Sequence, residues 1–186
     1  MVSKGLPDVL LKEMKGYGGK VHGSDADYVI ATENNAFPLP DELSFEEGAF
    51  LGCNAGTAYQ CGVELRLSAD DTVAIYGLGP VGLCALLVAK ARGSRVIGVD
   101  PVADRRKLAE ELGADAVLDG DRADVTDEVK RMTGGEGAEA ALDLTGVPVA
   151  RQSGADGRAL VAGDQLLRAR LYHSDGIVDL PVEHGG

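Results

Sequence analysis

The stretch from residue 71 to residue 100 constrains the fold of this chain more than any other part of it. A short apolar run at residues 73–76 leads into a glycine-rich turn at residues 77–82, and an apolar helical pattern continues to about residue 91. A second apolar run, residues 96–99, ends on Asp100. Strand, glycine turn, helix, strand and acid in this order predict a βαβ unit whose turn binds a dinucleotide.

The residue types in the turn suit separate physical tasks. Gly77 lets the chain leave the strand sharply, Gly79 lets a pyrophosphate approach the backbone, and Gly82 lets the helix pack closely on the strand. The first N–H groups of the helix lack partners within it and favour an anion. Asp100 has the spacing of a carboxylate that accepts hydrogen bonds from a ribose. A purely structural βαβ turn remains the alternative to dinucleotide binding. The residues predicted to hold the pyrophosphate are Gly77, Leu78, Gly79, Pro80, Val81 and Gly82.

The composition narrows the class of protein. The chain has 186 residues, 45% of them hydrophobic, and 30 acidic against 18 basic residues give a formal charge of -12. Such an acidic surface disfavours nucleic acid and anionic membranes as partners, and no apolar run approaches the ~18 residues of a transmembrane helix. Cys53, Cys61 and Cys84 are too few and too irregular for a disulfide framework, and the last two are interpreted as packing residues. We therefore expect a soluble, cytoplasmic protein with free thiols.

Patterns of strand and helix alternate along the rest of the chain. Residues 27–31 are predicted to form a strand, and a capping box that starts at Ser44 predicts a helix to about residue 51. Gly52 and Gly56 are expected to interrupt this helix before a second one at residues 57–65. Beyond residue 100, helices are predicted at residues 103–112 and 124–133, and strands at residues 116–118, 138–144 and 158–162.

Strands that alternate with helices predict an α/β fold with a doubly wound parallel sheet. Ligands of such sheets bind at the carboxyl ends of the strands. The predicted strand ends are Gly77, Asp100, Asp119, Thr145 and Gly163. The connection at residues 147–157 is short for a crossover helix. Residues 165–172 allow a helix-to-strand passage, and residues 177–186 have no convincing pattern.

Several motifs in the same order resemble the zinc-containing medium-chain alcohol and polyol dehydrogenases. Residues 22–29 (HGSDADYV) are similar to a strand of that family, and residues 39–47 (LPDELSFEE) are similar to its LPDxLSFEE segment. Residues 52–59 (GCNAGTAY) resemble its C-x-x-x-T-x-Y helix, and residues 111–115 (ELGAD) its ELGAD turn. The resemblance extends from about residue 21 to residue 149.

The resemblance implies a nicotinamide dinucleotide and hydride transfer to or from an alcohol carbon. It assigns the pyrophosphate to the glycine turn and the adenosine ribose to Asp100, with Arg105 over it. Thr57 would contact the nicotinamide side, while Thr145 and Gly163 would line the cofactor cleft. We expect NAD to be preferred over NADP, because Asp100 would repel a 2′-phosphate.

The resemblance also places Cys53 where the family has its third catalytic-zinc ligand. The family's first zinc cysteine, its Gly-His-Glu segment and its four-cysteine lobe have no counterpart, and His22, His173 and His184 lack a ligand-like spacing. A catalytic zinc needs three protein ligands, so we expect no zinc to be bound here. The chain is interpreted as a member truncated at both ends.

Two domains follow from this interpretation. Residues 1–66 would be a remnant of the GroES-like catalytic domain with its linking helices, and residues 67–186 an NAD-binding Rossmann domain with a shortened, irregular C-terminal part. We expect NAD binding with weak or no turnover, a small alcohol or aldehyde as substrate of any activity, and a possible homo-oligomer. A non-catalytic dinucleotide-binding or dimerising module and a zinc-free medium-chain reductase are the alternatives.

Overall fold

The computed structural model describes residues 26–31, 33 and 36–145, together with the backbone of strands at residues 158–161, 170–173 and 176–179. The chain divides into two compact units, Met1–Phe45 and Glu46–Gly186. All the described strands belong to the second unit. The expected boundary between residues 66 and 67 separates two domains of the family rather than two compact units, and it stays a prediction.

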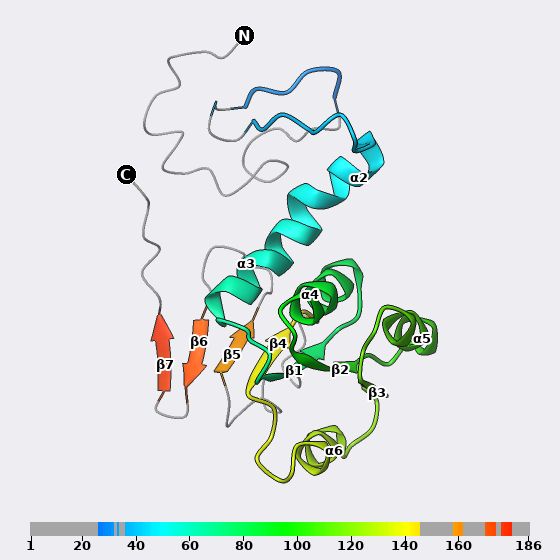
Figure 1. The fold of residues 1–186 in the computed structure, drawn as a ribbon, viewed down its shortest axis with the longest axis vertical. Coiled ribbons are helices and arrows are strands. Elements are labelled where there is room, and N and C mark those ends of the chain that lie inside the picture. Colours follow the sequence, from blue (N-terminus) through cyan, green and yellow to red (C-terminus); the bar gives the residue numbers. More distant parts are fainter. Residues whose placement is uncertain are drawn as a thin grey trace. The chain divides into compact units, whose positions relative to one another are not determined.

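A seven-stranded sheet forms the second unit, in the order β3-β2-β1-β4-β5-β6-β7 (Figure 1). Its strands are β1 (Thr72–Tyr76), β2 (Arg95–Val99), β3 (Ala116–Leu118), β4 (Ala140–Asp143), β5 (Arg158–Val161), β6 (Arg170–His173) and β7 (Gly176–Asp179). Strands β1 to β5 pair in parallel, as the sequence predicts. The first five strands thus form the predicted α/β sheet.

The last two strands, β6 and β7, extend the predicted parallel sheet and pair antiparallel. Only residues 174 and 175 separate β6 from β7, and so short a link cannot make the crossover that parallel strands require. The expectation that residues 177–186 lack a pattern is wrong for residues 177–179, which belong to β7. The remaining residues of that tail lie outside the described ranges.

Helices cover both faces of the sheet around β1. Helix α4 (Pro80–Ala91) joins β1 to β2, and α5 (Ala103–Glu111) joins β2 to β3. These two helices lie on one face, whereas α6 (Val125–Met132), which leads to β4, lies on the other (Figure 1). The direction of winding therefore reverses between β1 and β4, and such a switch point is where doubly wound sheets bind ligands.

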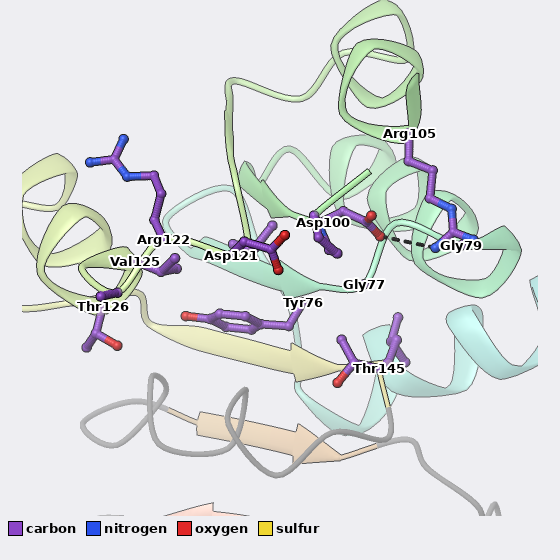
Figure 2. A pocket seen from close by; sticks show the side chains of 15 residues that line it. Tyr76, Gly77, Gly79, Asp100, Arg105, Asp121, Arg122, Val125, Thr126 and Thr145 are labelled. Carbon is purple, nitrogen blue, oxygen red and sulfur yellow. Dashed lines mark hydrogen bonds and ion pairs between the residues drawn. The ribbon is translucent and has the colours of Figure 1, made fainter. Parts of the chain in front are cut away.

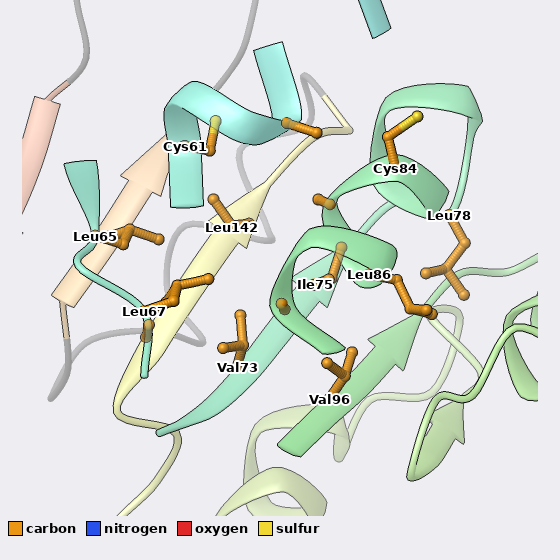
Figure 3. Close-up of a cluster of buried hydrophobic side chains, with 14 of the residues drawn as sticks. Cys61, Leu65, Leu67, Val73, Ile75, Leu78, Cys84, Leu86, Val96 and Leu142 are labelled. Atoms are coloured by element: carbon orange, nitrogen blue, oxygen red, sulfur yellow. The ribbon is translucent and has the colours of Figure 1, made fainter. Parts of the chain in front are cut away.

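The two faces of β1 belong to two hydrophobic clusters. Val73 and Ile75 pack with residues of α4 in the larger cluster, which Figure 3 shows. Ala74 and Tyr76 point to the opposite face, where Val129 of α6 completes the smaller cluster. A strand buried on both faces is apolar at every position rather than at alternate ones. This explains the continuous apolar run before the glycine turn.

The segment before the sheet is one helical run in three parts. These are α2 (Phe45–Phe50), the π-helix η2 (Leu51–Ala55) and α3 (Gly56–Glu64). The predicted interruption at Gly52 and Gly56 is wrong, because the backbone stays helical through both. A glycine costs a helix about 1 kcal/mol, and packing of α3 against α4 opposes that cost. The wider π turn absorbs the irregularity.

The strand predicted at residues 27–31 is also absent from the structure. These residues adopt bend and coil conformations, and residues 26–30 are exposed. Val29 and Ile30 form a short run of residues with high strand propensity, but a strand also requires a neighbour to accept its backbone hydrogen bonds. None of the described helices has the length and apolar character needed to cross a membrane.

Candidate nucleotide-binding site

Each glycine of the turn meets a different environment. Gly77 has φ of +92°, which favours glycine, and its N–H donates a hydrogen bond to the carbonyl of Val99 at 2.8 Å. A Cβ on Gly82 would lie 1.9 Å from the carbonyl oxygen of Gly77, so the start of α4 can approach the turn only without a side chain. A Cβ on Gly79 would meet no atom within 4 Å. Gly79 therefore borders open space, as a phosphate cradle requires.

Leu78 and Pro80 fix the turn from either side of Gly79. The Leu78 side chain is fully buried, and a Cβ on Gly98 of β2 would come within 3.1 Å of it. Pro80 is the first residue of α4, and Gly79 is its N-cap without a side-chain hydrogen bond. The first N–H groups of α4 therefore have no side-chain oxygen capping them and remain suited to an anion.

Asp100 links the end of β2 to the glycine turn. Its side chain is only 2% exposed. One oxygen, Oδ2, accepts a hydrogen bond from the Leu78 N–H at 2.8 Å, and Oδ1 accepts one from the Val102 N–H at 2.8 Å. The Arg105 guanidinium lies 3.5 Å from Oδ2. Each carboxylate oxygen can accept more than one hydrogen bond, so Asp100 can serve the turn and a ribose together.

The two arginines of α5 differ in their partners. Arg105 has a half-exposed side chain at the mouth of the site. Arg106 is more buried and donates to the carbonyl oxygens of Asp100 and Pro101 at 2.7 and 2.8 Å, with Asp119 at 3.4 Å. Arg106 therefore shapes the loop after β2, whereas the Arg105 side chain can follow a ligand.

A pocket of about 410 Å³ opens at the carboxyl ends of β1 to β4 (Figure 2). It brings together Gly77, Gly79, Asp100, Arg105 and Thr145 of the predicted residues. At its edge, the Thr145 hydroxyl donates to Asp143 Oδ1 at 2.7 Å. The volume is within the range of small-molecule and cofactor sites, ~300–1,000 Å³.

Other predicted residues lie elsewhere. Leu78 faces the core, and Pro80, Val81 and Gly82 form the first turn of α4 without lining the pocket. Thr57 is a half-buried residue of α3 and does not line it either. Gly163 lies outside the described residues. The turn thus contributes its glycine backbone to the pocket, while its apolar side chains hold it in place.

The far half of the pocket is lined by residues that the sequence does not predict as site residues. The additional lining residues include Tyr76, Gly120, Asp121, Arg122, Val125 and Thr126. Asp119 is predicted as a strand end, and the loop that follows it could have been included because loops after parallel strands converge. Tyr76 can be recognised as a pocket residue only when the side of the sheet that it faces is known. Its neighbour Ile75 faces the opposite hydrophobic cluster.

Cys53 is an exposed residue of η2. Within residues 26–145, apart from the gaps noted above, no three histidine, cysteine or acidic side chains are grouped to hold a metal ion. His22 and His184 lie outside the described residues, and only the backbone of His173 is described. The described residues therefore do not fit a zinc ion. Cys61 and Cys84 are buried in the larger cluster, which confirms their interpretation as packing residues.

Comparison with known proteins gives a consistent result. A family model described as zinc-binding dehydrogenase matches residues 80–157. The uncharacterized zinc-type alcohol dehydrogenase-like protein YphC of Escherichia coli K12 is 40% identical over 158 residues, 80% of this chain and 44% of YphC. D-arabitol-phosphate dehydrogenase of Enterococcus avium is 38% identical over 150 residues, 77% of this chain and 42% of that enzyme.

Solved structures agree with these relatives. The crystal structure of an NAD-dependent alcohol dehydrogenase matches with a TM-score of 0.69 and 33% identity, over 77% of this chain and 43% of that one. The chain spans less than half the length of these relatives. Fold and site define a Rossmann-type domain of the dehydrogenase class. The chain belongs to the medium-chain dehydrogenase family that contains the zinc-type alcohol dehydrogenases.

Proposed function

We propose that this chain binds NAD and descends from an enzyme that transfers hydride between an alcohol or polyol and the nicotinamide. The observation that carries the proposal is the buried carboxylate of Asp100 beside the glycine turn, in a pocket at the switch point of the sheet. Among the relatives are alcohol and polyol dehydrogenases. The bound nicotinamide supplies the hydride acceptor.

Different residues of the pocket bind different parts of the dinucleotide. The open space at Gly79 and the N–H groups of α4 receive the pyrophosphate. Asp100 accepts hydrogen bonds from ribose hydroxyls, and its Leu78 and Val102 partners hold it in position before the ligand arrives. Arg105 covers the ribose from the solvent side.

Asp100 also supports a preference for NAD over NADP. A 2′-phosphate would lie a few ångströms from a buried carboxylate, and two such charges repel by about 1–4 kcal/mol in a partly desolvated site. Arg105 compensates only in part, because it already lies 3.5 Å from Asp100. A ligand that binds only the native state raises the melting temperature, so both cofactors are titrated while melting is followed. A larger rise with NADP would reverse the assignment.

We infer little or no alcohol oxidation by this chain on its own. The inference rests on the described residues, among which no group of three possible ligands includes Cys53, whereas a catalytic zinc needs three. Steady-state assays with simple primary alcohols and aldehydes test it. Turnover of a few per second, within the usual enzyme range of roughly 1–1,000 per second, would contradict it. Zinc measured after dialysis, and lost in Cys53→Ser, would contradict the expected absence of a zinc site.

A non-catalytic dinucleotide-binding module is the second candidate. The observation that favours it is that the described residues lining the pocket, from Tyr76 to Thr145, all belong to the second unit. NAD binding without turnover in the assays above would support this role.

We also infer a cytoplasmic location from the acidic composition and the free cysteines. Exposed apolar residues of η2 and α3 lead us to infer a homo-oligomer.

A further inference from the structure

The pocket continues beyond Asp100 to the loop after β3 (Figure 2). With the pyrophosphate at the glycine turn and the ribose at Asp100, the base must extend away from the phosphates, because ribose joins the two. The far half of the pocket is therefore the place of the base, so this inference rests on the proposed NAD binding. The lining there is Tyr76, Gly120, Asp121, Arg122, Val125 and Thr126.

Tyr76 supplies an aromatic wall in this part of the pocket. It is the last residue of β1, its side chain is almost fully buried, and its ring lines the cavity. Aromatic side chains bind purine rings by stacking and by apolar contact, with little regard to the substituents on the base. Tyr76 therefore favours a base without identifying it, and a polar group must do that.

Asp121 is a polar group in the right place. Its N–H donates to Asp119 Oδ1 at 3.1 Å, which fixes the loop after β3. Its side chain lines the pocket, and in Figure 2 its carboxylate lies between the positions of Asp100 and Tyr76. Across the described ranges, this carboxylate makes no hydrogen bond and no ion pair with another residue.

The basic neighbours of Asp121 are engaged with other acids. Arg122 donates two hydrogen bonds to the Asp124 carboxylate, from Nε at 2.8 Å and from Nη2 at 2.7 Å. Arg106 lies 3.4 Å from Asp119. The Asp121 carboxylate therefore keeps its capacity to accept a hydrogen bond from a ligand, because an ionised carboxylate is an acceptor only.

We propose that Asp121 identifies the base of the bound dinucleotide by accepting a hydrogen bond from the exocyclic 6-amino group of adenine. Adenine presents N–H donors at that position, which match the carboxylate. Hypoxanthine carries a carbonyl oxygen there, so the two oxygen atoms repel and the carboxylate loses its solvation without a partner. The chain then prefers NAD to nicotinamide hypoxanthine dinucleotide, whose base differs from adenine in this group and in the hydrogen carried by the adjacent N1.

The test compares the dissociation constants of both dinucleotides by calorimetry for the original chain, Asp121→Ala and Asp121→Asn. We expect the original chain to bind NAD about three- to tenfold more tightly, which corresponds to the net contribution of one ordinary hydrogen bond, about 0.6–1.4 kcal/mol. Asp121→Ala should reduce the ratio to about twofold or less. Asp121→Asn should do the same or reverse it, because an amide can donate to the 6-oxo group.

The matched control is Asp127→Asn, which removes the same charge from an exposed residue of α6 that does not line the pocket. Its ratio should equal that of the original chain. Equal affinity of the original chain for both dinucleotides, or an unchanged ratio in Asp121→Ala, would overturn the role of Asp121 and leave NAD binding intact. Failure of both dinucleotides to bind would overturn the proposed function and this inference with it.

Discussion

Gly79 and Gly82 belong to the same turn, yet a methyl group added to each would meet different surroundings. At Gly79 it would project into open space, and the backbone there has φ of −73°, which alanine adopts readily. At Gly82 it would overlap the carbonyl oxygen of Gly77. One glycine is therefore a requirement of the ligand, and the other a requirement of the fold.

Alanine substitutions separate these two requirements. Gly79→Ala should leave the free energy of unfolding of the ligand-free protein within about 0.5 kcal/mol but weaken NAD binding about tenfold or more, since ~1.4 kcal/mol is tenfold. Gly82→Ala should destabilise the protein by about 1–3 kcal/mol or more through overpacking. Urea unfolding and NAD titration measure both. Unchanged NAD affinity in Gly79→Ala would place the pyrophosphate elsewhere.

The three cysteines should differ in reactivity. Burial raises the pKa of the Cys61 thiol to about 11 and also raises the pKa of Cys84. The thiolate is the reactive form, so both should stay inert near pH 8, whereas exposed Cys53 should react. An aromatic disulfide reagent should label one thiol rapidly in the native protein and all three in denaturant. Rapid native labelling of Cys61 or Cys84, mapped by mass spectrometry, would contradict the packing of α3 on α4.

At this scale the sequence predicts residues whose type is demanded by backbone geometry. Gly77 and Gly82 could be assigned because no other residue fits a sharp turn or a close helix approach. Asp100 could be assigned from its spacing, but not its bond to the Leu78 N–H. Asp121 could not be assigned, since an exposed loop aspartate is common and its position beside Tyr76 depends on how β1 and β3 lie in the sheet.

The helices of the second unit end in two ways. In α4 and α5 the residue after the cap is a glycine with positive φ, Gly93 or Gly113. Helix α3 uses Arg66 at the same place, with φ of +51°. The hydrogen bonds are the same kind, because Leu67 N–H donates to the Gly62 carbonyl and Arg66 N–H to the Val63 carbonyl.

Arg66→Gly should therefore stabilise the protein. A left-handed conformation costs a residue with a Cβ roughly 1–2 kcal/mol, and the greater chain entropy of glycine offsets part of that gain. We expect a net increase of about 0.5–1 kcal/mol in the free energy of unfolding. Arg66→Ala is the control, because it removes the exposed side chain but keeps the Cβ. Equal stability of the two variants would show that the gain comes from removing the arginine side chain rather than from relieving the left-handed backbone.

Elements inside the sheet were predicted better than those before it. The limits of β3 and of α4 follow from apolar runs bounded by glycine and proline, which mark them clearly. The run from α2 through η2 to α3 was misjudged because local propensity treats Gly52 and Gly56 as breaks. Packing of α3 against α4 decides the outcome instead, and that is not visible in a window of neighbouring residues.

The antiparallel pair of β6 and β7 adds to the predicted parallel sheet instead of continuing it. Its strands are short and follow a sheet that is parallel up to β5. A run of alternating strands and helices leads one to expect the same winding to continue. The separation of only two residues between β6 and β7 contains the information that this winding stops, because it admits a hairpin and no crossover.

For the whole molecule, the acidic charge and the exposed apolar residues of the helical run act in opposite directions. A formal charge of -12 repels a second copy. Phe50, Leu51 and Val63 are exposed on the run from α2 to α3, however, and burying them would favour association. Salt screens charge over about 10 Å at 0.1 M but leaves the apolar contribution in place. Self-association should therefore increase with salt.

Sedimentation velocity at several protein and salt concentrations measures this balance. The double substitution Phe50→Gln and Leu51→Gln should shift the distribution towards monomer and change the melting temperature little, because both side chains are exposed. The control is Ala49→Gln, at an exposed position of the same helix, which adds the same polar group without removing a large apolar one. A chain that stays monomeric at all salt concentrations, or a control that dissociates equally, would show that this helical face does not drive association.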